Sequence, residues 1–134
     1  ILMKKIILAT ALFLCLQINA QENTKISTID FVQVLNNNEN EVIYYYQNNW
    51  EVLRKMAVKK DYIHSYKLLK TTPTKEAPFS FMLITTYKNK MQFDKREKHF
   101  EELIKAKGKL QLLNNKKPGE FRKTIFGKDV YHKE

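Results

Sequence analysis

The chain alternates between two hydrophobic periods, and the order of these periods limits its fold more than any other feature. Apolar residues at every second position predict strands, and apolar residues spaced three and four apart predict helices. The expected elements are a strand, a helix, two strands, a helix and a strand, over residues 26–35, 41–60, 62–70, 79–87, 91–107 and 121–126. Residues 127–131 could extend the last strand.

Two of these elements carry the clearest local signals. In residues 79–87, aromatic and β-branched side chains alternate along the segment, which is typical of a strand. The segment 41–60 contains no glycine or proline, with Glu41 at its start and Lys59 near its end. Both charges are placed favourably for the dipole of a helix.

The element order predicts an α+β domain with a ferredoxin-like, or split βαβ, arrangement. We expect a four-stranded antiparallel sheet with two helices on one face. The first strand carries apolar residues on both faces, so the second face of the sheet would also be apolar. Because a monomer would expose that patch, we expect two copies to pair through their sheets as a homodimer.

The residues that carry a family resemblance are Phe31-Val32-Gln33-Val34, which lead into the helix that bears Trp50, and the segment 77–81, Ala-Pro-Phe-Ser-Phe. With these segments and the element order, the chain resembles the dimeric α+β barrel superfamily. That group includes antibiotic-biosynthesis-monooxygenase-like and stress-responsive barrel domains. The resemblance implies a sheet-paired dimer. Some members are cofactor-independent oxygenases, and others degrade haem; the haem-degrading residue set has no match by position in this chain.

Residues 1–20 have the three parts of a secretory signal peptide. Lys4-Lys5 form a basic start, residues 6–16 are almost wholly apolar, and Ala20 supplies a small residue at the expected cleavage edge. The apolar run is shorter than the ~20 residues that a membrane-spanning helix needs. We therefore expect cleavage and a secreted or periplasmic location.

The remaining residues, 21–134, are expected to form one domain with no stable membrane span. A retained N-terminal anchor and a lipoprotein attached at Cys15 are the alternatives, although Cys15 follows large apolar residues rather than small ones. Cys15 is the only cysteine, which excludes a multi-cysteine scaffold and a thiolate zinc finger.

The basic excess, a formal net charge of +10 at pH 7, does not predict nucleic-acid binding. The lysines are spread along the chain, and many alternate with acids, as in residues 94–98. Arginine, the better ligand for phosphates and bases, occurs only at Arg54, Arg96 and Arg122. We expect no nucleic-acid partner.

Five side chains are candidates for lining a cavity between helices and sheet: Trp50, His64, Tyr66, Phe81 and Tyr87. His64 shares its predicted strand face with Tyr62 and Tyr66, so it is the candidate for proton transfer or for orienting a phenolic ligand. The competing interpretation is ordinary core packing of these aromatic residues. Asp30 would be a candidate base if buried, but an exposed position is expected for it.

The sequence contains no phosphate loop, nucleophile elbow, zinc-protease motif or calcium loop, and we expect no metal or cofactor. The leading hypothesis is an exported domain that binds a small hydrophobic or aromatic ligand. The first alternative is a cofactor-independent monooxygenase or isomerase that uses His64. The second is an envelope interaction or structural module without a pocket. The sequence leaves open whether the protein is an enzyme.

Overall fold

A computed structural model describes residues 24–133 of the chain. The predicted signal peptide lies outside the described residues. The elements are, in chain order, β1 (Ile26–Val34), α2 (Glu39–Tyr45), η1 (Tyr46–Trp50), α3 (Glu51–Lys59), β2 (Ser65–Lys70), β3 (Phe81–Tyr87), α4 (Lys90–Asp94), α5 (Arg96–Lys107), α6 (Pro118–Phe121) and β4 (Arg122–Tyr131). Apart from the short α6 and the division of the two predicted helices into shorter segments, this is the predicted order, and the predicted α+β class is confirmed.

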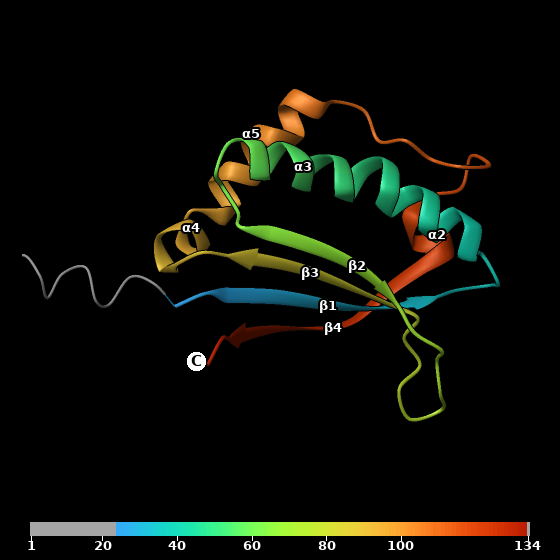
Figure 1. Cartoon of the computed structure of the whole chain (residues 1–134). Coiled ribbons are helices and arrows are strands. Elements are labelled where there is room, and N and C mark those ends of the chain that lie inside the picture. Colours follow the sequence, from blue (N-terminus) through green and yellow to red (C-terminus); the bar gives the residue numbers. More distant parts are fainter. Residues whose placement is uncertain (1–23, 134) are drawn as a thin grey trace, which may run out of the picture.

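The four strands form one sheet in the order β2-β3-β1-β4, and each neighbouring pair is antiparallel. The helices lie on one face of this sheet, as the ferredoxin-like arrangement predicts (Figure 1). Register places Asp30 opposite Leu83 on one side and opposite Gly127 on the other. Asp30 therefore sits mid-strand on β1, between two neighbouring strands.

The first predicted helix, 41–60, is observed as a continuous helical run from Glu39 to Lys59. Its middle five residues, Tyr46–Trp50, form a π-helical turn, in which the backbone N–H of Glu51 donates to the carbonyl oxygen of Tyr46. π-helical turns are rare in proteins overall, and those that do occur are often found at functional sites. The hydrophobic spacing of the segment carried no sign of this turn.

The second predicted helix, 91–107, is two helices rather than one. Asn89 caps α4 by accepting a hydrogen bond from the backbone N–H of Gln92 over 2.9 Å. Lys95 then leaves helical geometry, with φ −87° and ψ 0°, and α5 begins at Arg96. Because the break contains neither glycine nor proline, the sequence did not reveal it. Gly108 ends α5, as predicted, with φ +80°.

Three other boundaries differ from the prediction. The second strand begins at Ser65 rather than at residue 62, and the third begins at Phe81 rather than at residue 79. The Lys117-Pro118-Gly119 turn is the start of α6, whose N-terminus is closed by a hydrogen bond from Lys117 N–H to the Glu120 carboxylate. The last strand reaches Tyr131.

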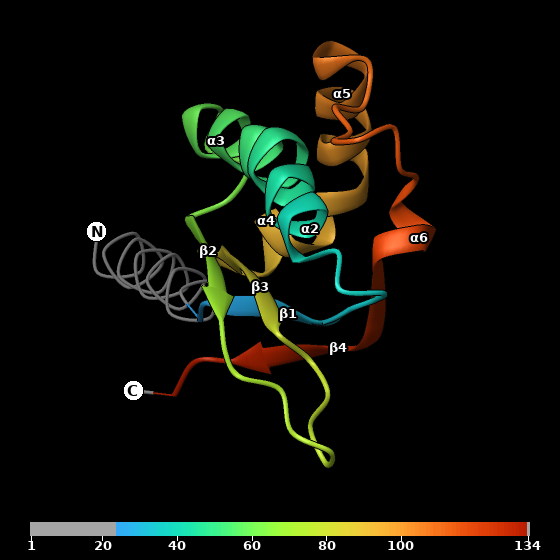
Figure 2. The same ribbon diagram turned by 90° about the vertical axis from the view of Figure 1, so that its right-hand side faces the viewer.

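The core between helices and sheet has two parts. Beneath α2 and η1, Val32, Val42, Tyr46 and Phe81 are buried together with Leu83 and Phe121. Beneath α3 and α5, the buried residues are Ala57, Ile63, Tyr87 and Leu103. α3 packs on β2 and α4 packs on β3, so these helices cover the β2–β3 half of the sheet (Figure 2).

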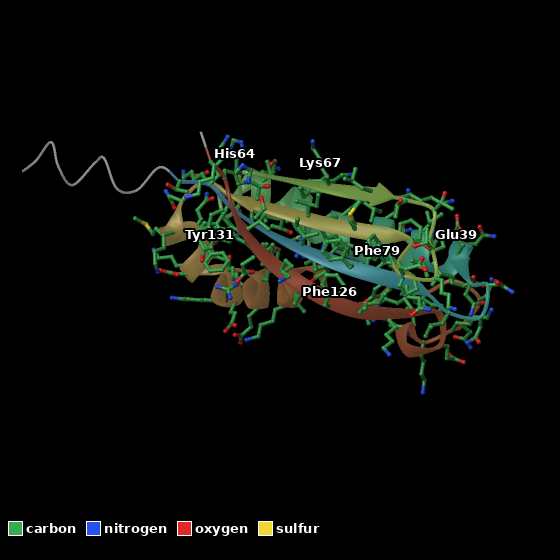
Figure 3. All side chains as sticks on the ribbon, turned by 90° about the horizontal axis from the view of Figure 1, so that it is seen from below. Glu39, His64, Lys67, Phe79, Phe126 and Tyr131 are labelled. Carbon is green, nitrogen blue, oxygen red and sulfur yellow. The ribbon has the colours of Figure 1, made fainter. Side chains whose placement is uncertain are left out.

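The opposite face of the sheet carries no helix and is partly apolar (Figure 3). Phe31 stacks on Phe126 with ring centroids 4.6 Å apart and meets Phe79 edge-on at 4.8 Å. We call this trio the aromatic face. Phe126 remains 44% exposed. Within residues 24–133, no helix is long and apolar enough to cross a membrane.

Candidate functional site

A groove runs between the helices and the β1–β4 half of the sheet. It has two adjoining hollows, which share Asp30, Leu53 and Ile104. The Tyr87 hollow has a volume of about 460 Å³, and its other lining residues are Thr28, Arg54, Tyr87, Arg96, Glu97, Phe100, Gly127, Lys128 and Asp129. The Trp50 hollow has a volume of about 410 Å³, and its other lining residues are Val32, Tyr45, Tyr46, Asn49, Trp50, Leu83, Gly108, Leu110, Arg122 and Thr124.

Arg54 extends from α3 into the Tyr87 hollow. Its Nε donates a hydrogen bond to Oγ1 of Thr85, on β3, over 3.1 Å. The guanidinium carbon lies 4.7 Å from the centre of the Trp50 ring and 4.2 Å from that of Phe100. Burial lowers the pKa of Arg54 to about 10, so the group still carries its charge at neutral pH. The two rings provide cation–π attraction where water has been displaced.

Asp30 stands on the floor of the groove, where both hollows meet. It is exposed as a residue, yet the groove walls partly desolvate its carboxyl group and raise its pKa. The nearby guanidinium of Arg54 opposes this shift, and the charge of Asp129 adds to it. A Cβ atom on Gly127 would lie only 2.9 Å from Oδ1 of Asp30. The glycine on β4 therefore leaves the space that this carboxylate occupies.

Three tyrosines line the groove, Tyr45 and Tyr46 in the Trp50 hollow and Tyr87 in the other. Burial raises the pKa of Tyr46 and, in the other hollow, that of Tyr87. Both phenols therefore stay protonated at neutral pH and can serve as hydrogen-bond donors. Together with Asp30 and Arg54, they give the groove a few polar groups within largely apolar and aromatic walls. This is the usual composition of a small-molecule site.

Asn49 holds the loop that borders the Trp50 hollow. Its amide nitrogen donates to the carbonyl oxygens of Tyr45 and Gln111, both over 2.8 Å. Its amide oxygen accepts from the backbone N–H of Gln111 and from Nζ of Lys107, again over 2.8 Å. The π-helical turn places this buried asparagine against the segment after Gly108, and that segment needs the anchor because it has no regular structure.

The five residues predicted to line a cavity lie in different places. Trp50 and Tyr87 line the groove. Tyr66 lies behind Trp50, which it meets edge-on with centroids 5.8 Å apart. Phe81 is buried in the core beneath α2 and does not border either hollow.

His64 lies outside the groove. It precedes β2, is exposed, and its backbone N–H donates to the carbonyl oxygen of Thr86. Tyr62, which was expected beside it, instead stacks on His99 of α5 with centroids 3.7 Å apart and donates a hydrogen bond to Glu102. The strand does not extend back to residue 62, so the alternation that would have grouped these side chains is absent.

Arg54 was not predicted as a groove residue. The expected exposure of Asp30 is confirmed, but its place in the groove was not predicted. A signal for Arg54 was present: it lies four residues after Trp50 and next to Leu53, so a charged side chain borders the apolar stripe of its helix. The signal for Asp30 was its place among apolar strand residues. Their meeting depends on how α3 packs over the sheet, which residue spacing does not give.

A further hollow of about 640 Å³ lies near the β2–β3 connection, with Gln33, Lys70 and Pro73 among its lining residues. Its charged groups, Lys70 and Glu39, are already paired with each other. The groove is the better candidate because its two central charges have no such partner among residues 24–133. Across the same residues, no cluster of three or more histidine, cysteine or acidic side chains could hold a metal ion.

Comparison with known proteins gives structural neighbours only. No protein-family model matches the chain. No curated protein matches it either. A solved structure from Nitrosomonas europaea, named for antibiotic biosynthesis monooxygenases, is 10% identical with a TM-score of 0.46; the match covers 84% of this chain and 90% of that one. An uncharacterized NIPSNAP-like domain protein from Burkholderia xenovorans is 7% identical with a TM-score of 0.42, covering 81% and 83%.

The α+β fold of this chain stands on its own strand order and helix placement.

Proposed function

We propose that this protein binds a small aromatic or hydrophobic molecule in the groove between its helices and the β1–β4 half of the sheet. The observation that carries the proposal is the pair of adjoining hollows, which meet at Asp30, Leu53 and Ile104. Together they offer apolar walls for the body of a ligand and a few polar groups to orient it.

Trp50 makes this proposal directly testable. It is the only tryptophan in the chain and it borders the groove, so its fluorescence reports on occupancy. We expect an aromatic panel, including naphthalene and toluene, to contain compounds that change this signal in a saturable way.

A matched pair of variants locates the binding. Ile104→Phe would narrow the groove, and Val58→Phe introduces the same side chain at an exposed position on α3 that does not line it. We expect Ile104→Phe to weaken binding and Val58→Phe to leave it unchanged. Absence of any saturable binding, or equal effects of the two variants, would contradict the proposal.

The proposal includes a homodimer, formed by two copies that pair through the aromatic face. Phe31, Phe79 and Phe126 form a contiguous apolar surface on the uncovered side of the sheet, and a second copy would remove that surface from water.

Light scattering tests the homodimer and should give twice the mass of the chain. Phe126→Lys should shift the mass to that of a monomer, whereas Met91→Lys, on exposed α4, should not. A monomeric wild type at micromolar concentration would overturn this part.

The enzymatic alternative, a cofactor-independent monooxygenase or isomerase, is favoured by one observation: Asp30 is a carboxyl of raised pKa inside the groove. It is the better placed proton acceptor, whereas His64 stays an untested prediction outside the groove. Turnover of phenolic or enolisable compounds should be lost in Asp30→Asn and kept in His64→Ala. The reverse result would restore the role first assigned to His64.

Export remains part of the proposal because of the signal-peptide pattern in residues 1–20. The full chain expressed in a bacterium should be recovered outside the cytoplasm with a new N-terminus near Gln21. Replacing Leu8 and Leu12 by arginine should keep it uncleaved and inside.

A further inference from the structure

Asp30 and Arg54 carry opposite charges in the same groove but are not paired. Among residues 24–133, neither forms a salt bridge. Their influence on each other is nevertheless mutual, since each charge stabilises the ionised form of the other. Both residues line the Tyr87 hollow, so a molecule in that hollow can reach both charges.

The guanidinium of Arg54 is held so that part of it stays available. Its Nε is used by Thr85, and the rings of Trp50 and Phe100 lie against the guanidinium carbon. No hydrogen bond from its two Nη atoms joins it to the described residues. A guanidinium presents these N–H groups as a planar fork that matches a carboxylate.

Asp30 is positioned by the sheet rather than by a cation. Its strand is paired on both sides, and its Oδ1 occupies the space left by the missing side chain of Gly127. An ionised carboxylate is only a hydrogen-bond acceptor, so its complement is a hydroxyl or N–H donor.

The other charges around the groove are mixed in sign. Arg96 and Lys128 face the Tyr87 hollow with Glu97 and Asp129, and Arg122 borders the Trp50 hollow. These groups do not favour a ligand of large net charge of either sign.

The uncharged lining has two parts. The phenols of Tyr46 and Tyr87 add hydrogen-bond donors, and the walls at Leu53 and Ile104 are apolar.

We propose that the groove selects small hydroxylated aromatic acids, an assignment that rests on the proposed binding function. The carboxylate of the ligand would accept hydrogen bonds from the Nη atoms of Arg54, and its hydroxyl would donate to Asp30. The ring would lie against Leu53 and Ile104. A hollow of 410–460 Å³ suits a compound of one or two rings.

The test uses four probes that differ by one group at a time: 4-hydroxybenzoate, benzoate, phenol and toluene. Calorimetric titration of the wild type should rank 4-hydroxybenzoate first, because it alone offers both the anion and the donor. We expect its affinity to exceed those of benzoate and phenol by at least about tenfold each, the lower end of the value of one hydrogen bond to a charged group.

Variants assign each group to its residue. Arg54→Met should weaken the binding of 4-hydroxybenzoate and benzoate but leave the affinity for phenol unchanged. Asp30→Asn should weaken the binding of 4-hydroxybenzoate and phenol but leave the affinity for benzoate unchanged. Gly127→Ala, which displaces the Asp30 carboxylate, should behave like Asp30→Asn. The controls are Lys105→Met and Asp94→Asn, which remove like charges from exposed positions outside the groove.

Each outcome decides between the two proposals. If toluene binds as tightly as 4-hydroxybenzoate, or Asp30→Asn and Arg54→Met affect all probes alike, the ligand class is wrong while the binding groove stands. If no probe and no apolar compound binds the wild type, the binding function itself fails. If Arg54→Met does not fold, the affinities of Asp30→Asn and Gly127→Ala for the four probes still test whether Asp30 recognises the hydroxyl group of the ligand.

Discussion

Arg54 on α3 donates a hydrogen bond from Nε to Oγ1 of Thr85, a buried residue of the interior strand β3. The bond fixes a charged side chain of the helix to the sheet at the side of the groove. Thr85→Val keeps the shape of the side chain and removes the acceptor. Because the Nε donor would then be left without its partner, we expect a loss of about 1–3 kcal/mol in the free energy of unfolding.

Urea denaturation measures this loss, and Thr85→Ser, which keeps the hydroxyl, should retain more of the stability. Equal stabilities of Thr85→Val and the wild type would show that the bond contributes nothing to the fold.

Leu103 and Ile104 are neighbours on α5 with different surroundings. Leu103 is fully buried in the core, whereas Ile104 is 54% exposed and borders the groove. Leu103→Ala should cost about 2–5 kcal/mol, since it leaves a cavity. Ile104→Ala should change stability by no more than about 0.5 kcal/mol. Comparable losses in the two variants, measured by urea denaturation, would contradict the observed orientation of α5.

Asn49 fixes the segment after Gly108 by hydrogen bonds to both backbone groups of Gln111. Asn49→Ala removes them, so the Gln111 amide should exchange its hydrogen much faster while strand amides remain protected. Asn48→Ala is the matched control, because Asn48 donates only to Tyr44 within its own helix. Unchanged exchange at Gln111 in Asn49→Ala would refute the anchoring role.

Asp30 should destabilise the fold when it is ionised. Burial raises its pKa above the 3.8 of an unperturbed aspartate, so the folded state disfavours the carboxylate relative to the unfolded chain. This penalty is fully present at neutral pH. It fades as the pH falls through the raised pKa, and it vanishes below 3.8, where both states are protonated.

Asp30→Asn should therefore be more stable than the wild type at pH 7, and the difference should shrink toward pH 3. Thermal unfolding across this pH range measures it, with Asp94→Asn as the control for an exposed acid. A variant that is less stable than the wild type at pH 7 would mean that attraction to Arg54 outweighs desolvation. A gain in stability together with a loss of binding is typical of functional residues.

The sequence by itself determined the elements and their order. Side-chain period is a local property, so the alternation in residues 79–87 and the helical spacing of residues 41–60 located a strand and a helix to within two residues at each end. The same patterns indicated which sides are apolar, and the order of elements then left few ways to arrange them.

Only the tertiary structure decided what the groove contains. Arg54 and Asp30 are 24 residues apart in the chain, and they share a groove because the packing of α3 on the sheet brings Arg54 to the same hollow that Asp30 lines. His64 shows the reverse: the alternation grouped it with Tyr66, but neither residue lines the groove, because β2 is the sheet edge opposite to β4. Local spacing fixes the side of an element on which a residue lies. Where two elements cross depends on packing between distant segments, including the π-helical turn and the break at Lys95, neither of which has a local sequence signal.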